Sequence, residues 1–400
     1  METYLDHAAA TYMDERVKRE MDKYCLKEYG NPGSFNTVGL RAKEAVDKAR
    51  EKVAGIIGAE PKEIIFTGSG TESINLAIKG VARALKKSGK GKHIITSTIE
   101  HHAVLDTCRY LEEEEGFEVT YVGVDRRGLV DPKDIESAIK EDTILISIMY
   151  ANNEIGTIEP IKEIGAIAKK HNITFHTDAC QAGMLDLDVR KLNADLMTLN
   201  GSKIYGPKGT GMLYVKKGTP IKPIIHGGGQ EFGLRSGTEN VPGIVGFAKA
   251  LEIAQHERKR EAKRLTILRD ALIKGLMKIP KVILNGHPTR RLPNNVNVSI
   301  LDIEGESLLL NLNEHGICAS SGSACASKSL KPSHVILATG VPAEIAHGSL
   351  RFTLGKRTTM KDIDKVVKVL PGIVERLREL SPVAIELEGK GESGEFKVRI

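Results

Sequence analysis

The stretch Lys62-Glu-Ile-Ile-Phe-Thr-Gly-Ser-Gly70, together with residues 71–87 that follow it, decides the fold class of this chain. Residues 62–66 form a short apolar run with β-branched side chains, which predicts a strand, and the glycine turn ends that strand. Apolar residues at positions 74, 78, 81 and 85 recur with the period of a helix, so residues 71–87 are predicted to be helical. The stretch is therefore a strand, a turn and a helix, the unit of α/β proteins.

The same order of elements recurs along the first two-thirds of the chain. Further strands are predicted over residues 93–97, 143–149, 174–177, 195–199 and 211–215, and helices over residues 102–115 and 161–171. Strands that alternate with helices of this length imply a mostly parallel sheet that is covered on both faces. Ligands of such sheets bind at the carboxyl ends of the strands, where the loops lie.

The pattern changes after Pro242. Residues 244–278 are predicted to form a long, charged, amphipathic helical stretch that could contain one break. Further strands (282–285 and 296–300) and helices (306–314 and 361–380) follow it. We therefore expect a large domain over residues 13–255 and a smaller α/β domain made of residues 1–12 and 256–382. Residues 383–400 alternate apolar and charged side chains around a Gly/Ser turn, which predicts a C-terminal extension containing a hairpin.

Composition and charge exclude several classes of protein. Four hundred residues suit one large and one smaller domain, and 40% hydrophobic with 28% charged residues is typical of a globular protein. The net charge of +6 is spread along the chain and aromatic residues make up only 4%, so no direct nucleic-acid binding is expected. No stretch approaches about 18 apolar residues and the N-terminus does not resemble a signal peptide, so we expect no membrane span and a cytoplasmic location.

The cysteines are sparse and odd in number, which argues against a disulfide framework. They are Cys25, Cys108, Cys180, Cys318 and Cys325. No CxxC motif occurs, and Cys318 and Cys325 are too far apart in the sequence for a zinc knuckle, so no resident metal is expected.

A lysine and an aspartate follow two of the predicted strands. Lys203 lies in the glycine-rich turn that spans residues 200–211, where it could hold a cofactor aldehyde as a Schiff base. Asp178 ends an earlier strand, and the pyridine nitrogen of pyridoxal phosphate requires such an acidic partner. Each residue alone has a commoner explanation, a surface lysine in a loop and a helix cap. Their pairing across one strand–helix–strand unit favours pyridoxal phosphate.

Two further turns suit the same cofactor. Thr67-Gly-Ser-Gly-Thr71 places backbone N–H groups and small hydroxyl side chains at the start of a helix, which makes a phosphate cradle. Any turn between a strand and a helix favours such residues, so this motif is weak on its own. His101 follows a predicted strand, and it could stack on the cofactor ring and move protons near neutral pH.

The order and spacing of motifs over residues 3–382 resemble the NifS/IscS-type cysteine desulfurases of the class V aminotransferase family. These motifs are Tyr4-Leu-Asp6, Gly30-Asn-Pro32, Phe66-Thr-Gly-Ser-Gly-Thr-Glu-Ser73, Glu100-His101, Asn152-Asn-Glu-Ile-Gly156, Asp178-Ala-Cys-Gln181, Lys203-Ile-Tyr-Gly-Pro-Lys-Gly209, His226-Gly-Gly-Gly229, Arg235-Ser-Gly-Thr238, Ser320-Ser-Gly-Ser-Ala-Cys325 and His347-Gly-Ser-Leu-Arg351. The resemblance implies the PLP-dependent transferase fold of type I, with pyridoxal 5′-phosphate as cofactor. It also implies L-cysteine as substrate and a homodimer.

The resemblance assigns a role to individual residues. It makes Lys203 the Schiff-base lysine, His101 the ring-stacking residue and Cys325 the thiol that receives sulfur as a persulfide. The expected cofactor-binding residues are Lys203, Asp178, Gln181, Asn153, Gly70, Thr71, Ser202, His101 and Thr238, the last reaching the phosphate of the partner subunit. Arg351, whose planar guanidinium suits a carboxylate, and Asn153 are expected to bind the substrate.

Cys325 decides the reaction type, and its loop belongs to the smaller domain. Residues 320–326 are Ser, Gly, Ala and this cysteine, and an exposed thiolate in such a loop can take sulfur from bound cysteine and pass it on. A buried structural cysteine is the commoner case in general. Cys318 is expected in the core, and strand alternation is expected to point Cys180 away from the cofactor.

The implied reaction converts L-cysteine to L-alanine. By the resemblance, the sulfur goes to iron–sulfur cluster assembly through a scaffold protein of the IscU type, and a role in tRNA thiolation is a further possibility. Cys325 could also ligate an iron–sulfur cluster transiently together with such a partner.

Two residues of the turn that contains Lys203 depart from the family pattern, and two other functions stay open. Asn200 and Ser202 stand where the family usually has serine and histidine, although Ser202 can still donate to a phosphate. The first alternative is another PLP enzyme of this fold, such as a selenocysteine lyase or an aminotransferase, and the latter needs no thiol like Cys325. The second is a non-catalytic docking platform for an iron–sulfur scaffold protein, against which the intact Lys203, Asp178 and Cys325 argue.

Overall fold

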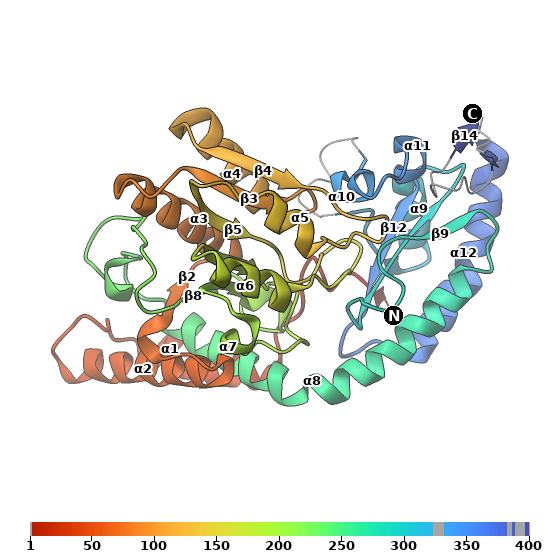
Figure 1. Ribbon diagram of the computed structural model, residues 1–400. Helices are drawn as coiled ribbons and strands as arrows, with labels where there is room; N and C mark the ends of the chain where they lie inside the picture. Colours follow the sequence, from red (N-terminus) through yellow and green to blue (C-terminus); the bar gives the residue numbers. More distant parts are fainter. Residues whose placement is uncertain (1, 323–331, 382–385, 389–396, 400) are drawn as a thin grey trace.

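The computed structural model describes residues 2–322, 332–381, 386–388 and 397–399. It consists of two parts that the long helix α8 (Val241–Leu276) connects, running along the bottom of Figure 1 from one part to the other. A seven-stranded sheet forms the centre of the first part and a three-stranded sheet the centre of the second. The expectation of an α/β protein with a mostly parallel main sheet is confirmed.

The main sheet has the strand order β2-β8-β7-β6-β5-β3-β4. Its strands are β2 (Ile64–Thr67), β3 (His93–Ser97), β4 (Glu118–Val122), β5 (Thr143–Ser147), β6 (Thr174–Asp178), β7 (Leu196–Asn200) and β8 (Gly211–Val215). Strand β8 pairs antiparallel with both β2 and β7, whereas the remaining pairs are parallel. Six strands therefore run in one direction, and their carboxyl ends lie at one edge of the sheet.

Helices bury both faces of this sheet. One face packs against α1 (Glu15–Leu26), α2 (Thr37–Ile57), α5 (Pro132–Ser137), α6 (Ile161–Lys170), α7 (Val189–Leu192) and the first turns of α8. The other face packs against α3 (Gly70–Lys87) and α4 (His102–Glu115). Successive strand residues alternate between the two cores: Ile64 and Phe66 point to the first and Ile65 to the second. This two-sided burial explains why the strands are apolar runs.

The second part combines an antiparallel sheet with helices on one side. Strands β9 (Val282–Leu284), β10 (Asn295–Ile300) and β12 (Ser349–Thr353) pack with α9 (Gly305–Glu314), α12 (Met360–Leu380) and the end of α8. The short helices α10 (His334–Ala338) and α11 (Ala343–Ala346) form a small core of their own with the first part. Strand β1 (Thr3–Tyr4) pairs with β11 (Ile317–Cys318), so the start of the chain lies in this part. Near the C-terminus, β13 (Glu386–Glu388) pairs antiparallel with β14 (Lys397–Arg399).

Some elements differ from those predicted. Helix α8 is continuous, so the break that the sequence allowed does not occur. Helices α1 and α2 and strand β4 had not been predicted. Strand β4 is at the edge of the sheet and most of its side chains are partly exposed, so its sequence lacks a continuous apolar run.

A carboxyl group is fully buried beneath the carboxyl edge of the sheet. Oε1 of Glu100, just after β3, accepts hydrogen bonds from Ser97 Oγ at 2.7 Å and from Met149 N at 2.9 Å. Its Oε2 has no hydrogen-bond partner among the described residues. Burial raises the pKa of Glu100 to about 8, so the side chain is mainly neutral at pH 7.

Replacing Phe247 by alanine should destabilise the first part severely. Phe247 of α8 is completely buried, and its ring lies edge-on to Phe66 of β2 with centroids 6.3 Å apart. The cavity left by Phe247→Ala is expected to lower the free energy of unfolding by about 3–5 kcal/mol in urea denaturation. Ile267→Ala, at a site 57% exposed on the same helix, should change it by less than about 0.5 kcal/mol. Equal effects of the two variants would contradict this packing.

Glu100→Gln should change the pH dependence of stability. The folded pKa of Glu100, about 8, lies above the ordinary value of 4.5, so its contribution to stability is present below pH 4.5 and is lost as the pH rises toward 8. Glutamine resembles the protonated carboxyl and does not titrate. Relative to the wild type, the variant should therefore gain roughly 2–3 kcal/mol of unfolding free energy between pH 5 and pH 7. The exposed Glu304→Gln should show no such gain, and a pH-independent difference for Glu100→Gln would contradict the neutral carboxyl.

Candidate active site

The loops at the carboxyl edge of the main sheet enclose a cavity of about 270 Å³. Loops after five of the parallel strands line it: β2, β3, β5, β6 and β7. Strand β12 of the second part and the N-terminal segment complete the wall. The predicted residues that line this cavity are Gly70, Thr71, His101, Asn153, Asp178, Gln181, Ser202, Lys203 and Arg351. The structure therefore brings together residues that are up to 281 positions apart in the sequence.

Lys203 ends a short 3-10 helix, η2 (Gly201–Lys203), that directly follows β7. Its Nζ donates a hydrogen bond to the carbonyl of Ala9, which also lines the cavity. The turn is held by Thr11, whose N–H and Oγ1 both donate to the carbonyl oxygen of Ser202 at 2.9 Å. The lysine amine is thus presented to the cavity by a turn that the N-terminal segment fixes.

Asp178 is the last residue of β6 and is buried. Its Oδ1 accepts a hydrogen bond from the N–H of Cys180 at 2.9 Å. Gln181 reaches the N-terminal segment, with its Nε2 donating to the carbonyl of Ala8 at 3.2 Å. Asp178 and Gln181 line the cavity together with Lys203. An aromatic ring bound there would find a carboxylate and an amide within the same lining.

His101 is the N-cap of α4. Its Nδ1 accepts a hydrogen bond from the N–H of Ala103 at 3.0 Å, so the neutral ring carries its proton on Nε2. Burial lowers the pKa of His101, and the neighbouring Asp178 only partly opposes this shift. The imidazole therefore enters the site as a neutral N–H donor.

The start of α3 forms a cradle in which a larger side chain does not fit. A Cβ atom at Gly70 would lie 2.8 Å from Cys180 Sγ and 3.1 Å from Asn200 Nδ2. The N-terminus of this 18-residue helix directs backbone N–H groups toward the cavity, where Thr71 adds a hydroxyl. Such an arrangement suits a phosphate group.

Cys180 lines the cavity, so the expectation that it points away from it is wrong. Strand β6 ends at Asp178 and the chain turns there, so the alternation of a strand no longer applies two residues later. Burial raises the pKa of Cys180 well above its ordinary value, which keeps it a thiol. Cys318 lies in β11 and is only half-buried, rather than in the core.

The turn after β5 depends on Asn152, a residue to which sequence analysis assigned no role. Its Oδ1 accepts from the N–H groups of Glu154 at 2.8 Å and Ile155 at 2.9 Å, and its Nδ2 donates to the carbonyl of Ile99 at 2.9 Å. The side chain thus shapes the turn that presents Asn153. Asparagine commonly stabilises turns by such bonds to nearby backbone, which was the available signal.

Arg351 lies on β12 and is only 1% exposed. Its Nη2 is 2.8 Å from Asp6 Oδ1, and its Nη1 donates to the carbonyl of Asn153 at 3.0 Å. No described residue accepts a hydrogen bond from its buried Nε. A buried guanidinium that lines the cavity with an unused N–H is suited to bind an anionic group there.

Two of the predicted residues, Cys325 and Thr238, are not among the described residues that line the cavity. Cys325 lies outside the described residues. Of the residues that flank it, Ser320 exchanges backbone hydrogen bonds with Arg351, and Ser333 donates from Oγ to Glu154 Oε2 at 2.5 Å. Thr238 is exposed and lines a different hollow between β2 and α8, so its expected role depends on a partner subunit.

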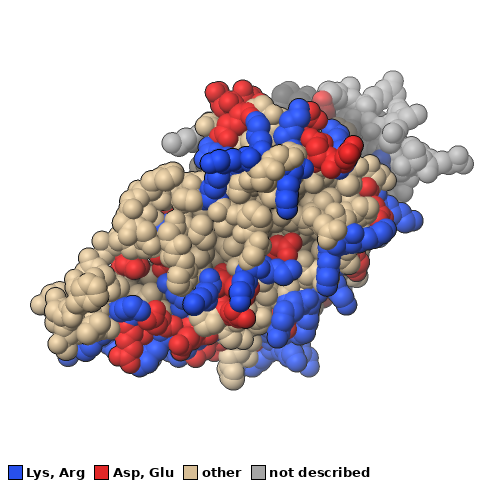
Figure 2. Space-filling model, turned by 60° about the vertical axis from the view of Figure 1, so that its left-hand side comes forward, with Lys and Arg blue, Asp and Glu red and all other residues tan. Residues whose placement is uncertain are grey.

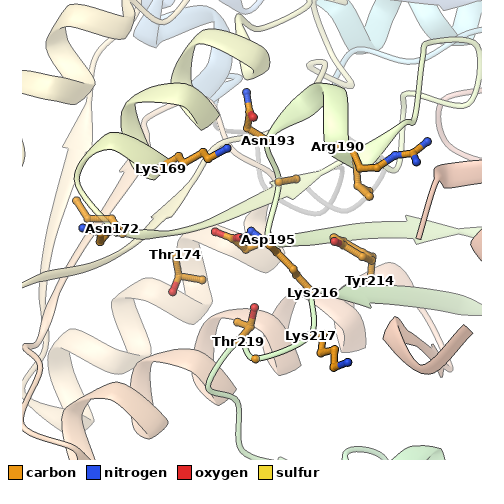
Figure 3. A pocket seen from close by; sticks show the side chains of 14 residues that line it. Lys169, Asn172, Thr174, Arg190, Asn193, Asp195, Tyr214, Lys216, Lys217 and Thr219 are labelled. Carbon is orange, nitrogen blue, oxygen red and sulfur yellow. Dashed lines mark hydrogen bonds and ion pairs between the residues drawn. The ribbon is translucent and has the colours of Figure 1, made fainter. Parts of the chain in front are cut away.

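A second hollow, of about 520 Å³, lies at the opposite edge of the sheet, and Figure 3 shows its residues. It is formed at the start of β6, before β7 and at the end of β8. Lys216 is paired with Asp195 at 2.9 Å, and Figure 3 shows Lys217 and Arg190 directed away from the centre. None of the predicted site residues lines this hollow, so the smaller cavity is the candidate active site.

The described residues give two further results. No group of three or more histidine, cysteine, aspartate or glutamate side chains among them is arranged to hold a metal ion. No helix in the described part of the chain is long and apolar enough to cross a membrane.

Comparisons with known proteins agree with this site. Residues 3–366 match the family profile of class V aminotransferases. Cysteine desulfurase IscS of Methanosarcina thermophila is 57% identical over 381 residues, which is 95% of this chain and 94% of that protein. Cysteine desulfurase IscS of Dictyoglomus turgidum is 54% identical over 383 residues, 95% of this chain and 96% of that protein.

Solved structures show the same likeness. A NifS-like protein superposes with a TM-score of 0.88 at 43% identity, covering 94% of this chain and 100% of that chain. SspA in complex with cysteine has a TM-score of 0.77 at 38% identity, covering 88% of this chain and 98% of that chain. These matches confirm the PLP-dependent transferase fold of type I.

The cofactor of these enzymes, pyridoxal phosphate, suits the residues that line the cavity. Lys203 and Asp178 fit its aldehyde and its ring nitrogen, and the glycine cradle at the start of α3 fits its phosphate. Sequence, fold and site therefore agree, and the chain belongs to the class V aminotransferase family and, within it, to the pyridoxal-phosphate-dependent cysteine desulfurases.

Proposed function

We propose that this enzyme converts L-cysteine to L-alanine and that Cys325 receives the sulfur as a persulfide. The observation that carries the proposal is the cavity in which Lys203, Asp178 and Arg351 converge. A cofactor-holding amine, an acidic partner for the cofactor ring and a buried guanidinium for a carboxylate are the groups that such a reaction on an amino acid requires. Their convergence also argues against a non-catalytic docking platform.

The roles of the chain's own groups follow from their positions. When bound, pyridoxal phosphate withdraws electrons from the α-carbon of the amino acid. Lys203 would hold the cofactor and, from its place in the cavity lining, would move the α-proton. Asp178 would keep the ring nitrogen protonated, and Gln181 and Asn153 would bond to the ring substituents. The residues that would hold the phosphate are Gly70, Thr71 and Ser202.

Neutral His101 and buried Arg351 orient the reactants. His101 would lie against the ring of a bound cofactor with Nε2–H as its donor, because its Nδ1 accepts the N–H of Ala103. The guanidinium of Arg351 binds the α-carboxylate of the substrate, with Asn153 beside it. This placement fixes which end of the amino acid faces the reacting groups.

The sulfur-transfer step belongs to Cys325. Its thiolate attacks the sulfur atom of bound cysteine, so that an S–S bond forms while the C–S bond breaks. The electron pair of the C–S bond stays with carbon, which takes up a proton and leaves as alanine. The described residues around the Cys325 segment support this role, because Ser320 pairs with the backbone of Arg351 and Ser333 bonds to Glu154 beside Asn153.

A homodimer completes the site in this proposal. Large apolar side chains are exposed around the α1–α2 turn and the loop after β8: Leu26 (84%), Tyr29 (73%), Phe35 (96%) and Phe232 (55%). Both segments lie at the left-hand end of the molecule in Figure 1, and Figure 2, which turns that side forward, shows wide uncharged areas between charged ones. Such a surface favours burial against a second copy. Thr238, in the same loop, would then reach the phosphate in the partner subunit's cavity.

The proposed sulfur acceptor is an iron–sulfur scaffold protein of the IscU type, with tRNA thiolation as a second use of the persulfide. Support comes from the likeness to desulfurases of the IscS type along 95% of the chain. Transient ligation of an iron–sulfur cluster by Cys325 together with such a partner belongs to the same proposal.

Cys325→Ser should abolish sulfur transfer without loss of the cofactor. Alanine formation from L-cysteine is expected to fall by about 100-fold or more, because serine cannot accept sulfur, while the yellow absorption of the bound cofactor persists. Alanine is quantified by amino-acid analysis under steady-state conditions. Cys25→Ser, an exposed cysteine of α1, is the matched control and should leave the rate unchanged. Native rates in Cys325→Ser would refute the assignment.

Phe35→Asp should weaken the proposed dimer. A charge at the centre of an apolar contact is expected to shift the protein from dimer to monomer in sedimentation velocity, and to raise the dissociation constant for pyridoxal phosphate about tenfold. Leu310→Asp, at a residue 69% exposed on α9 of the second part, is the control and should leave the dimer intact. A monomeric wild type that binds the cofactor fully would contradict the proposal.

A further inference from the structure

The N-terminal segment, residues 6–11, contacts several residues of the candidate active site. Ala8 and Ala9 line the cavity, and their carbonyl groups accept hydrogen bonds from Gln181 and Lys203. Thr11 holds the turn before Lys203 through the carbonyl of Ser202. Asp6 also contacts a residue that lines the cavity, Arg351. This contact is an ion pair, whereas the others are hydrogen bonds to backbone carbonyl groups.

The guanidinium of Arg351 is fixed at two of its three nitrogen atoms. Nη2 lies 2.8 Å from Asp6 Oδ1, and Nη1 lies 3.0 Å from the carbonyl oxygen of Asn153. Because Arg351 is 1% exposed, its charge needs a counter-charge inside the protein, and Asp6 supplies one. The third nitrogen, Nε, has no partner among the described residues. Bonds at both Nη atoms thus hold the guanidinium in a single orientation and leave Nε–H without a described partner.

Asp6 is itself anchored to the strand that carries Arg351. Residue 6 forms a parallel bridge with Thr353 of β12, and the next residue, His7, donates from its N–H to the carbonyl of Thr353 at 3.3 Å. The N–H of Ala8 donates to Thr353 Oγ1 at 2.8 Å. The backbone therefore sets the position of the Asp6 carboxylate relative to Arg351, two residues along β12 from this anchor.

We propose that Asp6 is a positioning residue for the substrate: it orients the Arg351 guanidinium for the α-carboxylate and so sets the affinity for carboxylate-bearing amino acids. This inference rests on the proposed role of Arg351. Asp6 does not itself hold the substrate; it acts through Arg351. Without it, the buried guanidinium loses both its counter-charge and the bond that orders it, and the substrate has to order it on binding. Binding then weakens, whereas the groups that carry out the chemistry stay in place.

The first test compares Asp6→Ala and Asp6→Asn in the holoenzyme with L-cysteine as substrate. Asp6→Ala is expected to raise KM about tenfold and to change kcat by less than about threefold, since only binding is affected. Asparagine keeps an acceptor oxygen but loses the charge, so Asp6→Asn should raise KM by roughly threefold. Thr3→Ala is the matched control. It removes a 3.1 Å hydrogen bond from Thr3 of β1, three residues before Asp6, to Asp362, and should leave KM unchanged.

The second test separates orientation of the guanidinium from a general loosening of the site. Binding of L-alanine and of ethylamine, which lacks a carboxylate, is followed by the change in visible absorption. Asp6→Ala should weaken L-alanine about tenfold and leave ethylamine unchanged. Equal weakening of both amines would overturn the inference.

Arg351→Ala distinguishes failure of this inference from failure of the proposed function. A large rise of KM in Arg351→Ala with an unchanged KM in Asp6→Ala would overturn the role of Asp6 alone. An unchanged KM in Arg351→Ala would overturn the role of Arg351, and the role of Asp6 with it.

Discussion

Parallel strands need a crossover to return the chain to the same side of the sheet, and this constraint creates the active site. The segment that follows each parallel strand therefore leaves at the same edge. In this protein the carboxyl ends of β2, β3, β5, β6 and β7, or the segments just after them, bring Gly70, His101, Asn153, Asp178 and Lys203 in that order to the cavity. Strand β8 runs antiparallel, and it starts beside Thr67 at this edge, so the short link from Lys203 to β8 stays at the site.

The sheet alone leaves the cavity open toward the second part of the molecule. Strand β12 closes that side with Arg351, and the N-terminal segment lies between the two parts and contacts both Arg351 and Lys203. Helix α8 connects the parts without a break and contributes to both large cores. The position of Arg351 relative to Lys203 thus depends on packing across the whole molecule rather than on a single loop.

Local sequence patterns predicted the elements that are buried on both faces. Strands β3 and β8 have the predicted bounds because each is an apolar run ended by a turn. Strand β4, at the edge of the sheet, was not predicted, because its partly exposed side chains do not form a continuous apolar run. The pair of Asp178 and Lys203 was visible because both follow strands of one unit. By contrast, the partners Asp6 and Arg351 are 345 positions apart, and no local pattern indicates such a contact.

The expected direction of Cys180 was wrong for a related reason: the rule of alternation holds within a strand, and the end of β6 at Asp178 could be located only from the structure. Thr238 is exposed and lines another hollow rather than the cavity of its own chain, so its proposed role depends on a partner subunit. The sequence motifs nevertheless named nine of the cavity's lining residues, because groups that bind a cofactor occur in short segments with characteristic residue types.

Cys180 also lines the cavity, but its environment makes it a poorer sulfur acceptor than the proposed Cys325. A thiolate, not a thiol, attacks sulfur, and the pKa of Cys180 is raised by burial and by the neighbouring Asp178. The imidazole that could take its proton is not available, because the Nδ1 of His101 accepts the N–H of Ala103 and its Nε2 carries the proton. Burial also leaves Glu100 neutral beneath the same edge. Cys180, His101 and Glu100 are thus held in their neutral forms, which favours a thiolate from another segment, as proposed for Cys325.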